Sequence, residues 1–331
     1  MELRPLDPLD DDAMAAAYTV ECATNQKAQP GWVPLGLEAR ILGWRAVNGW
    51  RNNLTGAWSG TTLLGFAAAM TADDTPDVTW VFAWVDPGHQ GSGIGSALVR
   101  AAEAAAPEST TRFVASASRA RPADIQAFSL RFAGPLGYSP ATTETVVELD
   151  LGQALLPEPE EAGGYTISTY VNGVPEQFRR QVGRIKGLVD AQAPNGDLHW
   201  SETPVSLEEY AREIQTWSAQ GYTVFESLAV DTDGNVAAWT CLLAAADSGR
   251  PAHVEGTLVL TGHRGRRLGT LVKLACLREV AGTGTVHTVR TSSDDQNVWM
   301  RSINDQLGFI PVETEIILQK EARSVRLGTA G

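Results

Sequence analysis

The sequence predicts an α/β protein in which one domain plan is used twice. The chain has 331 residues, and a chain of that length usually divides into two domains, each with its own core. A glycine-rich segment occurs twice, as "VDPGHQGSGIG" at 85–95 and as "VLTGHRGRRLG" at 259–269. Gln90 of the first segment stands opposite Arg264 of the second, an offset of 264 − 90 = 174 residues. Because the same order of helices and strands surrounds both segments, we interpret the chain as a domain duplication.

Alternating apolar residues and turn residues predict the elements of the first half in order. A short strand, "ELRPL", precedes two helices at 10–23 and 36–49. Three strands follow, "LTGAWSG", "TTLLGFAAAM" and "DVTWVFAWV", and the glycine-rich segment then opens the helix "GSALVRAAEAAA". The strand "RFVASAS", the helix "DIQAFSLRFAG" and the strand "TETVVELDL" complete this half, which we expect to form a domain over 1–151.

The second half repeats this order. The strand "YTISTY" precedes helices near 175–191 and 206–219, and the strands "YTVFESLAV", "NVAAWTCLLAA" and "HVEGTLVL" follow. The second glycine-rich segment opens the helix "LGTLVKLACLREVA", and "VHTVRTSS", "NVWMRSINDQLG" and "VETEIILQ" close the domain as strand, helix and strand. We expect this domain over 165–320, after a linker at 152–164 rich in proline, glycine and glutamate, and before a flexible tail at 321–331.

Composition and charge exclude several classes of function. The formal net charge of −13 at pH 7 argues against nucleic acid and anionic membrane surfaces as partners, since both attract clusters of Lys and Arg. No apolar run approaches the roughly 18 residues of a membrane span. The acidic start "MELRPLDPLDDDAM" differs from a signal peptide, so we expect a cytoplasmic protein. Cys22, Cys241 and Cys276 lie far apart and are expected to be buried free thiols, and the sequence contains no metal-ligand pattern.

The glycine-rich segments are typical of anion sites. Each follows a strand and opens a helix, whose first-turn N–H groups lack partners within the helix and lie at the positive end of its dipole. Glycine lets the backbone approach an oxyanion closely. A Walker A loop is excluded because neither segment ends in Gly-Lys-Ser/Thr. A dinucleotide-binding loop fits poorly, because Ser96 stands where its third glycine belongs.

The segments instead resemble the (Gln/Arg)-x-x-Gly-x-(Gly/Ala) signature of the GNAT family of acyl-CoA-dependent N-acyltransferases. The residues that carry this resemblance are Val85, Pro87, Gln90, Gly93 and Gly95 in the first half and Val259, Arg264 and Gly269 in the second. The later segment "NVWMRSINDQLGF" is similar to an Asn-rich helix of that family. The resemblance implies two tandem domains, each a mixed, mostly antiparallel sheet flanked by helices.

The resemblance also implies that each turn binds the pyrophosphate of acetyl-CoA through backbone amides, and that two parallel strands part just before the turn to admit the pantetheine arm. The implied cofactor-binding residues are Val85, Gln90, Gly91, Ser92, Gly93, Ile94, Gly95 and Ser96 in the first half and Val259, Arg264, Gly265, Arg266, Arg267, Leu268, Gly269 and Thr270 in the second. Asn297 would bond to pantetheine, although an asparagine there is also a good helix cap. Arg267 replaces a glycine of the signature, and it either crowds the turn or pairs with a phosphate. We favour the pairing, because this stretch is basic in an otherwise acidic protein.

The two halves differ where the family often carries a catalytic carboxylate, four residues before the Val of each segment. The second half has Glu255 there and the first has Val81. An amine must lose its proton before its lone pair can attack a thioester, so Glu255 is the candidate general base. The alternation of "HVEGTLVL" predicts that His253, Glu255 and Thr257 share a face. Glu255 could instead be a sheet-edge residue that points to solvent.

We therefore expect the second half to be catalytic, and the first to bind acyl-CoA at most or to shape the substrate site. Many family members also carry a tyrosine on the last helix that protonates the leaving thiolate. Asn304 stands at that position in the second half and Ala133 in the first. The general acid is then water, another residue or unnecessary.

The acceptor is expected to be a primary amine of a small molecule or a peptide. In this family the amine contacts the connection between the first two helices, here "DAQAPNGDLHWSETP" at 190–204. It carries two acids and two rings that suit a cation: Asp197, His199, Trp200 and Glu202. Two hypotheses remain from the sequence, direct acetyl transfer to such an amine and a catalytically silent acyl-CoA sensor that binds a partner protein.

Overall fold

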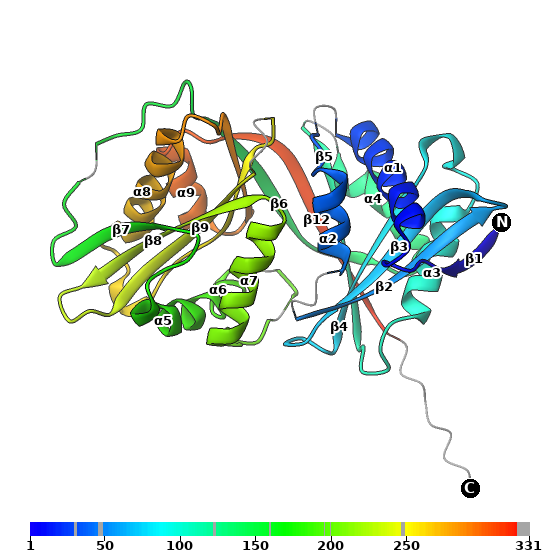
Figure 1. Cartoon of the computed structure of the whole chain (residues 1–331), viewed down its shortest axis with the longest axis horizontal. Coiled ribbons are helices and arrows are strands. Elements are labelled where there is room, and N and C mark those ends of the chain that lie inside the picture. The colour runs from blue at the N-terminus through cyan, green and yellow to red at the C-terminus, as the bar shows by residue number, and fades with distance from the viewer. Residues whose placement is uncertain are drawn as a thin grey trace, which may run out of the picture. The chain divides into compact units, whose positions relative to one another are not determined.

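The computed structural model of the chain describes residues 1–29, 32–45, 49–121, 124–158, 160–194, 196–198, 200–245 and 249–322. The chain forms two compact units (Figure 1). Unit 1 consists of Met1–Trp32, Gly49–Ala141 and Glu315–Gly331, and unit 2 consists of Val33–Asn48 and Thr142–Thr314. No helix within the described ranges is long and apolar enough to span a bilayer. Most of the expected tail, residues 323–331, lies outside the described residues.

Unit 1 is a mixed sheet with helices packed against it. Its strands lie in the order β1-β2-β3-β4-β5-β12, antiparallel from β1 to β4 and parallel between β4 and β5. The strands are β1 (Glu2–Pro5), β2 (Trp50–Ser59), β3 (Thr62–Ala72), β4 (Val78–Val85), β5 (Arg112–Ala120) and β12 (Ile310–Glu321), of which unit 1 holds the part from Glu315 on. The helices are α1 (Asp11–Ala28), α3 (Ile94–Ala104) and α4 (Ile125–Ala133), with short 3₁₀ turns η1 (Pro87–His89) and η2 (Gly134–Leu136).

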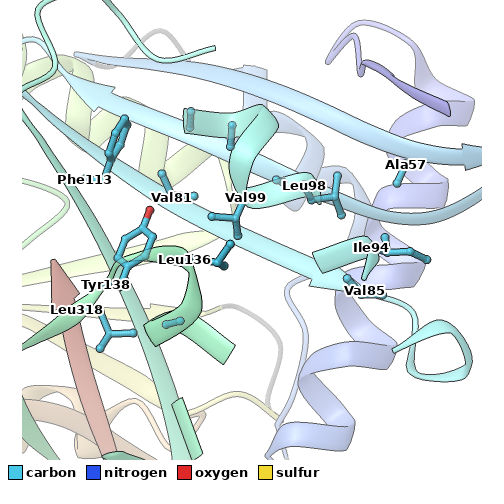
Figure 2. Packing of buried hydrophobic residues seen from close by; sticks show 14 of the residues in the cluster. Ala57, Val81, Val85, Ile94, Leu98, Val99, Phe113, Leu136, Tyr138 and Leu318 are labelled. Carbon is cyan, nitrogen blue, oxygen red and sulfur yellow. The ribbon is translucent and has the colours of Figure 1, made fainter. Parts of the chain in front are cut away.

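The hydrophobic core of unit 1 lies between the sheet and the helices α3 and α4 (Figure 2). Helix α3 buries Ile94, Leu98 and Ala102, which follow each other at intervals of four and so form one face of the helix. Val81 of β4 belongs to the same cluster. The position that the sequence compares with Glu255 is therefore part of an apolar core in this unit.

Unit 2 has the same kind of sheet, in the order β6-β11-β10-β9-β8-β7. Here the pair β10–β11 is parallel, while the neighbouring pairs β6–β11, β9–β10, β8–β9 and β7–β8 are antiparallel. The strands are β6 (Ser139–Asp150), β7 (Tyr165–Val171), β8 (Tyr222–Asp231), β9 (Val236–Ala245), β10 (Ala252–Val259) and β11 (Thr288–Asp294). The helices are α2 (Leu37–Arg45), α5 (Glu176–Lys186), α6 (Val189–Gln192), α7 (Leu207–Ala219), α8 (Leu268–Gly282) and α9 (Val298–Gln306), with the 3₁₀ turn η3 (Thr261–His263).

Helices cover both faces of the sheet in unit 2. Figure 1 shows α8 and α9 on one face and α5, α6 and α7 on the other. Strand β9 is buried along its whole length because both of its faces are covered. Leu242 packs toward α8, where Leu277 belongs to the same cluster. Trp239 packs toward α5 and α7 with Val182 and Tyr210.

Most of the last strand of each half lies in the unit formed mainly by the other half: unit 2 holds β6 from Thr142 on, and unit 1 holds β12 from Glu315 on. The sequence predicted contiguous domains over 1–151 and 165–320, each closed by its own last strand. Instead, β6 pairs with β11 of unit 2 from Glu144–Asp294 to Asp150–Thr288. Ile316, from the end of the chain, is buried in the core of unit 1. Both last strands alternate apolar and polar residues, so either sheet satisfies their pattern and the sequence alone does not select the partner.

Candidate functional site

In each unit two parallel strands part just before the glycine-rich turn. Strand β4 pairs with β5 from Val78–Arg112 to Trp80–Val114, yet β4 continues to Val85. Along the fully described strands β10 and β11, pairing is confined to Ala252–Val289 and His253–Arg290. The rest of β10, up to Val259, thus has no strand neighbour on that side and exposes backbone N–H and C=O groups to the gap. The parting expected from the sequence is found in both units.

The two turns are tied to their strands in the same way. Gln90 donates from Nε2 to the carbonyl oxygen of Val85, and Arg264 donates from Nε to that of Val259, each over 3.1 Å. Both turns are exposed and both lead directly into the first turn of a helix. The Gln/Arg residue of the signature therefore holds each turn against the end of its strand, and the backbone amides of the turn stay accessible.

The residue before each helix has a left-handed backbone. In α3 this residue is Gly93, at φ 86°, and in α8 it is Arg267, at φ 60°. A left-handed conformation costs a non-glycine residue roughly 1–2 kcal/mol. Arg267 therefore adopts the left-handed backbone that Gly93 adopts freely in unit 1, so the turn keeps its shape despite the arginine.

The arginines of the second turn have protein partners in this structure. Arg267 pairs with Glu160 of the segment between the halves. Arg266 donates to the hydroxyl of Tyr165 over 2.8 Å, and Arg264 donates to the side chain of Gln192 over 2.8 Å. The side chains of Arg267 and Glu160 are each 60% exposed. Because such an exposed pair is weak, a phosphate could replace Glu160 at little cost.

A glycine in the first turn of each helix allows close packing against the last helix. A Cβ on Gly95 would lie 3.2 Å from Phe132 and 3.6 Å from Val85. A Cβ on Gly269 would lie 3.0 Å from Ile303 and 3.4 Å from Val259. These contacts correspond in the two units, with Phe132 equivalent to Ile303.

These features fit the coenzyme A expected from the sequence. Each unit offers an accessible turn at a helix N-terminus and a gap between strands that leads to it. In unit 2 the Oγ of Ser293 on β11 is also buried without a hydrogen-bond partner among the described residues. Asn297 caps α9 by accepting from the backbone N–H of Met300 over 3.1 Å, so its expected capping role is confirmed.

Glu255 occupies a β-bulge on β10. Val254 pairs with Leu242 and Gly256 with Cys241, so Glu255 has no residue opposite it on β9. A bulge bends its strand and redirects side chains. The bulge lies just after the last residue that pairs with β11, at the point where the strands part.

The bulge also overturns the prediction that His253, Glu255 and Thr257 share a face. His253 Nε2 does lie 4.0 Å from Glu255 Oε1. Thr257, however, contacts the hydroxyl of Thr240 at 2.7 Å, on the face covered by α8. The extra residue in the strand moves Thr257 to the opposite face. The side chain of Glu255 is 34% exposed.

A buried polar network lies near Glu255 on the α5–α7 face. Glu226, fully buried on β8, accepts hydrogen bonds from Tyr210 at 2.5 Å and from the indole of Trp239 at 2.9 Å. Lys186 pairs with Glu213. Burial raises the pKa of Glu213, Lys186 opposes this shift, and the negative charge of Glu255 adds to it. Burial alone would lower the pKa of Lys186, but Glu213 beside it keeps that pKa above its ordinary value.

The connection at 190–204, where the acceptor is expected to bind, follows a helix that lies close to the bulge. Helix α6 packs against β10, and Val189 lies 3.4 Å from where a Cβ on Gly256 would stand. Asp197 and Glu202 are exposed and Trp200 is half-buried. His199 lies outside the described residues.

Lys273 of α8 was missed by the sequence analysis. It is 1% exposed and donates to the side-chain oxygen of Asn304 on α9 over 2.6 Å. The repeat contained the signal: with the offset of 174, Lys273 stands opposite Val99 of α3 (273 − 99 = 174). A lysine opposite a core valine marks a buried charge.

Comparisons with known proteins agree with this geometry. Residues 22–129 match the Acetyltransferase (GNAT) family. A tandem GNAT protein from the clavulanic acid biosynthesis pathway has the same fold, with a TM-score of 0.80 and 23% identity over 97% of this chain and 98% of that one. A GCN5-related N-acetyltransferase from Sphaerobacter thermophilus gives a TM-score of 0.67 and 19% identity over 97% and 95%. No match was found among curated proteins. Residues 22–129 thus match the GNAT acetyltransferase family, and the chain has the fold of the tandem GNAT protein over nearly its whole length.

Proposed function

We propose that unit 2 transfers an acetyl group directly from acetyl-CoA to a primary amine. The observation that carries this proposal is the position of Glu255, on a bulge where β10 leaves β11. A carboxylate there can reach an amine on the α5–α7 side, while the gap between the strands admits a thioester from the turn. In unit 1 the equivalent position is Val81, which is buried in the core.

The turn of unit 2 would hold the coenzyme. Backbone amides from Arg264 to Thr270 face the pyrophosphate at the N-terminus of α8, where the helix dipole favours negative charge. Arg267 exchanges Glu160 for a phosphate oxygen. Asn297 and the unpaired edge of β10 bind the amides of the pantetheine arm. Bound acetyl-CoA supplies the activated acyl group.

Glu255 acts as the general base. Reference pKa values of roughly 7.7–8.0 for an α-amine and 10.4 for an ε-amine mean that the acceptor arrives mostly as an ammonium. Glu255 takes one proton from it, directly or through water, and the freed lone pair forms the C–N bond as the C–S bond breaks. The nitrogen then gives up a second proton to water to become the neutral amide. His253, 4.0 Å from Glu255, lies on the same side and can pass that proton to solvent.

The acceptor binds beside α6. Asp197, Glu202 and Trp200 offer charge and a ring face to a cation, and His199 belongs to the same connection. The tandem GNAT protein of similar fold comes from the clavulanic acid biosynthesis pathway, which supports a small-molecule amine over a peptide. Unit 1 retains a complete turn and binds acyl-CoA without catalysis, or shapes the substrate site.

Release of free thiol from acetyl-CoA, measured with a panel of primary amines, tests this function. The expected result is amine-dependent thiol release together with an acetylated product of the added amine. Coenzyme A binding without thiol release above background would instead favour an acyl-CoA sensor. Absence of coenzyme A binding in calorimetry would contradict both functions.

A further inference from the structure

Lys273 is a buried lysine for which the described part of the chain offers no carboxylate partner. Its Nζ lies 2.6 Å from the Oδ1 of Asn304, 4.0 Å from the Sδ of Met300 and 5.1 Å from the ring centre of Phe309. No carboxylate of the described residues forms an ion pair with it. Burial lowers the pKa of Lys273 to about 7. Lysines are almost never buried in this way unless they are paired.

The equivalent positions of unit 1 are apolar. Helices α3 and α8 begin at Ile94 and Leu268, an offset of 268 − 94 = 174, so Val99 corresponds to Lys273. The contacts of Gly95 and Gly269 equate Phe132 with Ile303, so Ala133 corresponds to Asn304.

Both of these residues of unit 1 lie in its core, where Figure 2 labels Val99 close to Leu136. The same backbone thus accepts an apolar pair. The Lys273–Asn304 pair is not required for folding of this kind of domain.

The pair lies at the interface of α8 and α9, on the helix-covered side of the strand gap. Helix α8 packs on β7, β8, β9 and β10, and residues of α9 pack in the same cluster as residues of β6 and β11. Val254 of β10 and Val289 of β11, at the point where the two strands part, belong to the same cluster as Leu274 of α8 and Ile303 of α9, so the gap begins beside this interface. Two buried polar atoms in this region lack a hydrogen-bond partner among the described residues, Asn304 Nδ2 and Ser293 Oγ. Such orphan atoms in a dry interior favour a bound polar group.

We propose that Lys273 donates the proton that the leaving thiolate of coenzyme A takes up, and that Asn304 holds the ammonium group in place. This inference rests on the acyltransferase function proposed for unit 2. As the C–S bond breaks, its electron pair stays on sulfur, and a proton moves from Nζ of Lys273 to that sulfur. The neutral Lys273 regains a proton from water after the thiol leaves. Lys273 thereby fills a role that the neutral amide of Asn304, standing at the position of the family's tyrosine, cannot fill because it has no acidic proton.

A titration of bound coenzyme A tests this contact without turnover. Coenzyme A is added in saturating amounts to the full chain and to Lys273→Met, and the ultraviolet absorbance of the thiolate is followed against pH. Because an ammonium within about 4–6 Å lowers the pKa of an acid by about 1–3 units, we expect the thiolate to appear at least one pH unit lower in the wild-type protein. Thiol bound by unit 1 contributes equally to both titrations and cancels in the difference.

Lys320 provides a matched control lysine. It also lies over aromatic rings, those of Tyr138 and Phe113, but it pairs with Glu103 in unit 1. Lys320→Met should leave the thiolate titration unchanged and lower thermal stability. Lys273→Met should raise thermal stability and, if amines are acetylated, lower kcat about 100-fold with the KM for acetyl-CoA within twofold.

The outcomes separate the two proposals. Coenzyme A that fails to bind unit 2 overturns the proposed function and this inference with it. Coenzyme A that binds with the same thiolate titration in the wild type and Lys273→Met overturns only the role of Lys273. Loss of thermal stability in Lys273→Met, with kcat unchanged, would make Lys273 a structural residue.

Discussion

Lys273 donates a 2.6 Å hydrogen bond to Asn304 in an interior where unit 1 places Val99 and Ala133. This exchange of an apolar pair for a polar one has a cost. Burial lowers the pKa of Lys273 from 10.5 to about 7, whereas the unfolded chain retains the ordinary value. The native state therefore binds fewer protons than the unfolded state between about pH 7 and pH 10.

Stability should accordingly depend on pH through Lys273. The penalty is fully present below about pH 7 and is lost as the pH rises toward 10, because the unfolded lysine then also becomes neutral. A shift of this size corresponds to roughly 4–5 kcal/mol. Urea unfolding at pH 6, 8 and 9.5 should show Lys273→Met more stable than the wild type, by a margin that shrinks with pH. A margin that is constant across this range would contradict the assigned pKa.

Arg267 is expected both to strain the backbone of the turn and to strengthen the binding of coenzyme A. Arg267→Gly removes a left-handed arginine at φ 60° and should raise the free energy of unfolding by about 1 kcal/mol. Arg267→Ala keeps the strained backbone and should not. Both variants lose the guanidinium group, so both should bind coenzyme A several-fold more weakly in calorimetry. If Arg267→Gly alone binds more weakly, turn geometry and not charge is responsible.

The exchanged last strands predict crossed effects on stability. Ile316 is fully buried in unit 1, although it follows the second half of the chain. Ile316→Ala should cost about 2–5 kcal/mol and should increase hydrogen exchange in β3 and β4. Val147→Ala, in the first half, should instead affect β11 of unit 2, where Val147 pairs with Thr291. Contiguous domains would give the reverse pattern.

The buried pair of Lys186 and Glu213 should behave as a unit. Lys186→Met leaves Glu213 buried without its counter-charge and should cost about 3–5 kcal/mol. The double variant Lys186→Met/Glu213→Gln should recover most of this loss, as measured by denaturant unfolding. Additive losses in the two single variants and the double variant would show that the two side chains do not interact.

The order of elements, the two turns and the parting of the parallel strands follow from the sequence, because apolar alternation and glycine placement are local properties. The partner of each last strand does not follow, since β6 and β12 satisfy either sheet. The predicted face of Thr257 is wrong because one bulge residue, Glu255, shifts the alternation of strand β10. The sequence carries no signal for this bulge. The sequence did not predict the burial of Lys273, because a lysine in a helix normally lies on the surface. Only its alignment with Val99 separates it from a surface residue.

The most direct test of the account is the amine-dependent rate of thiol release by Glu255→Gln, compared with Glu279→Gln, an exposed glutamate of α8 in the same unit, and with Val81→Ala. We predict that Glu255→Gln lowers kcat/KM about 100-fold near neutral pH while coenzyme A binding stays within twofold. The loss should shrink at high pH, where the acceptor amine is already neutral. Glu279→Gln and Val81→Ala should retain activity. Full activity of Glu255→Gln at every pH, with loss of activity in Val81→Ala, would contradict the account and move the catalytic site to unit 1.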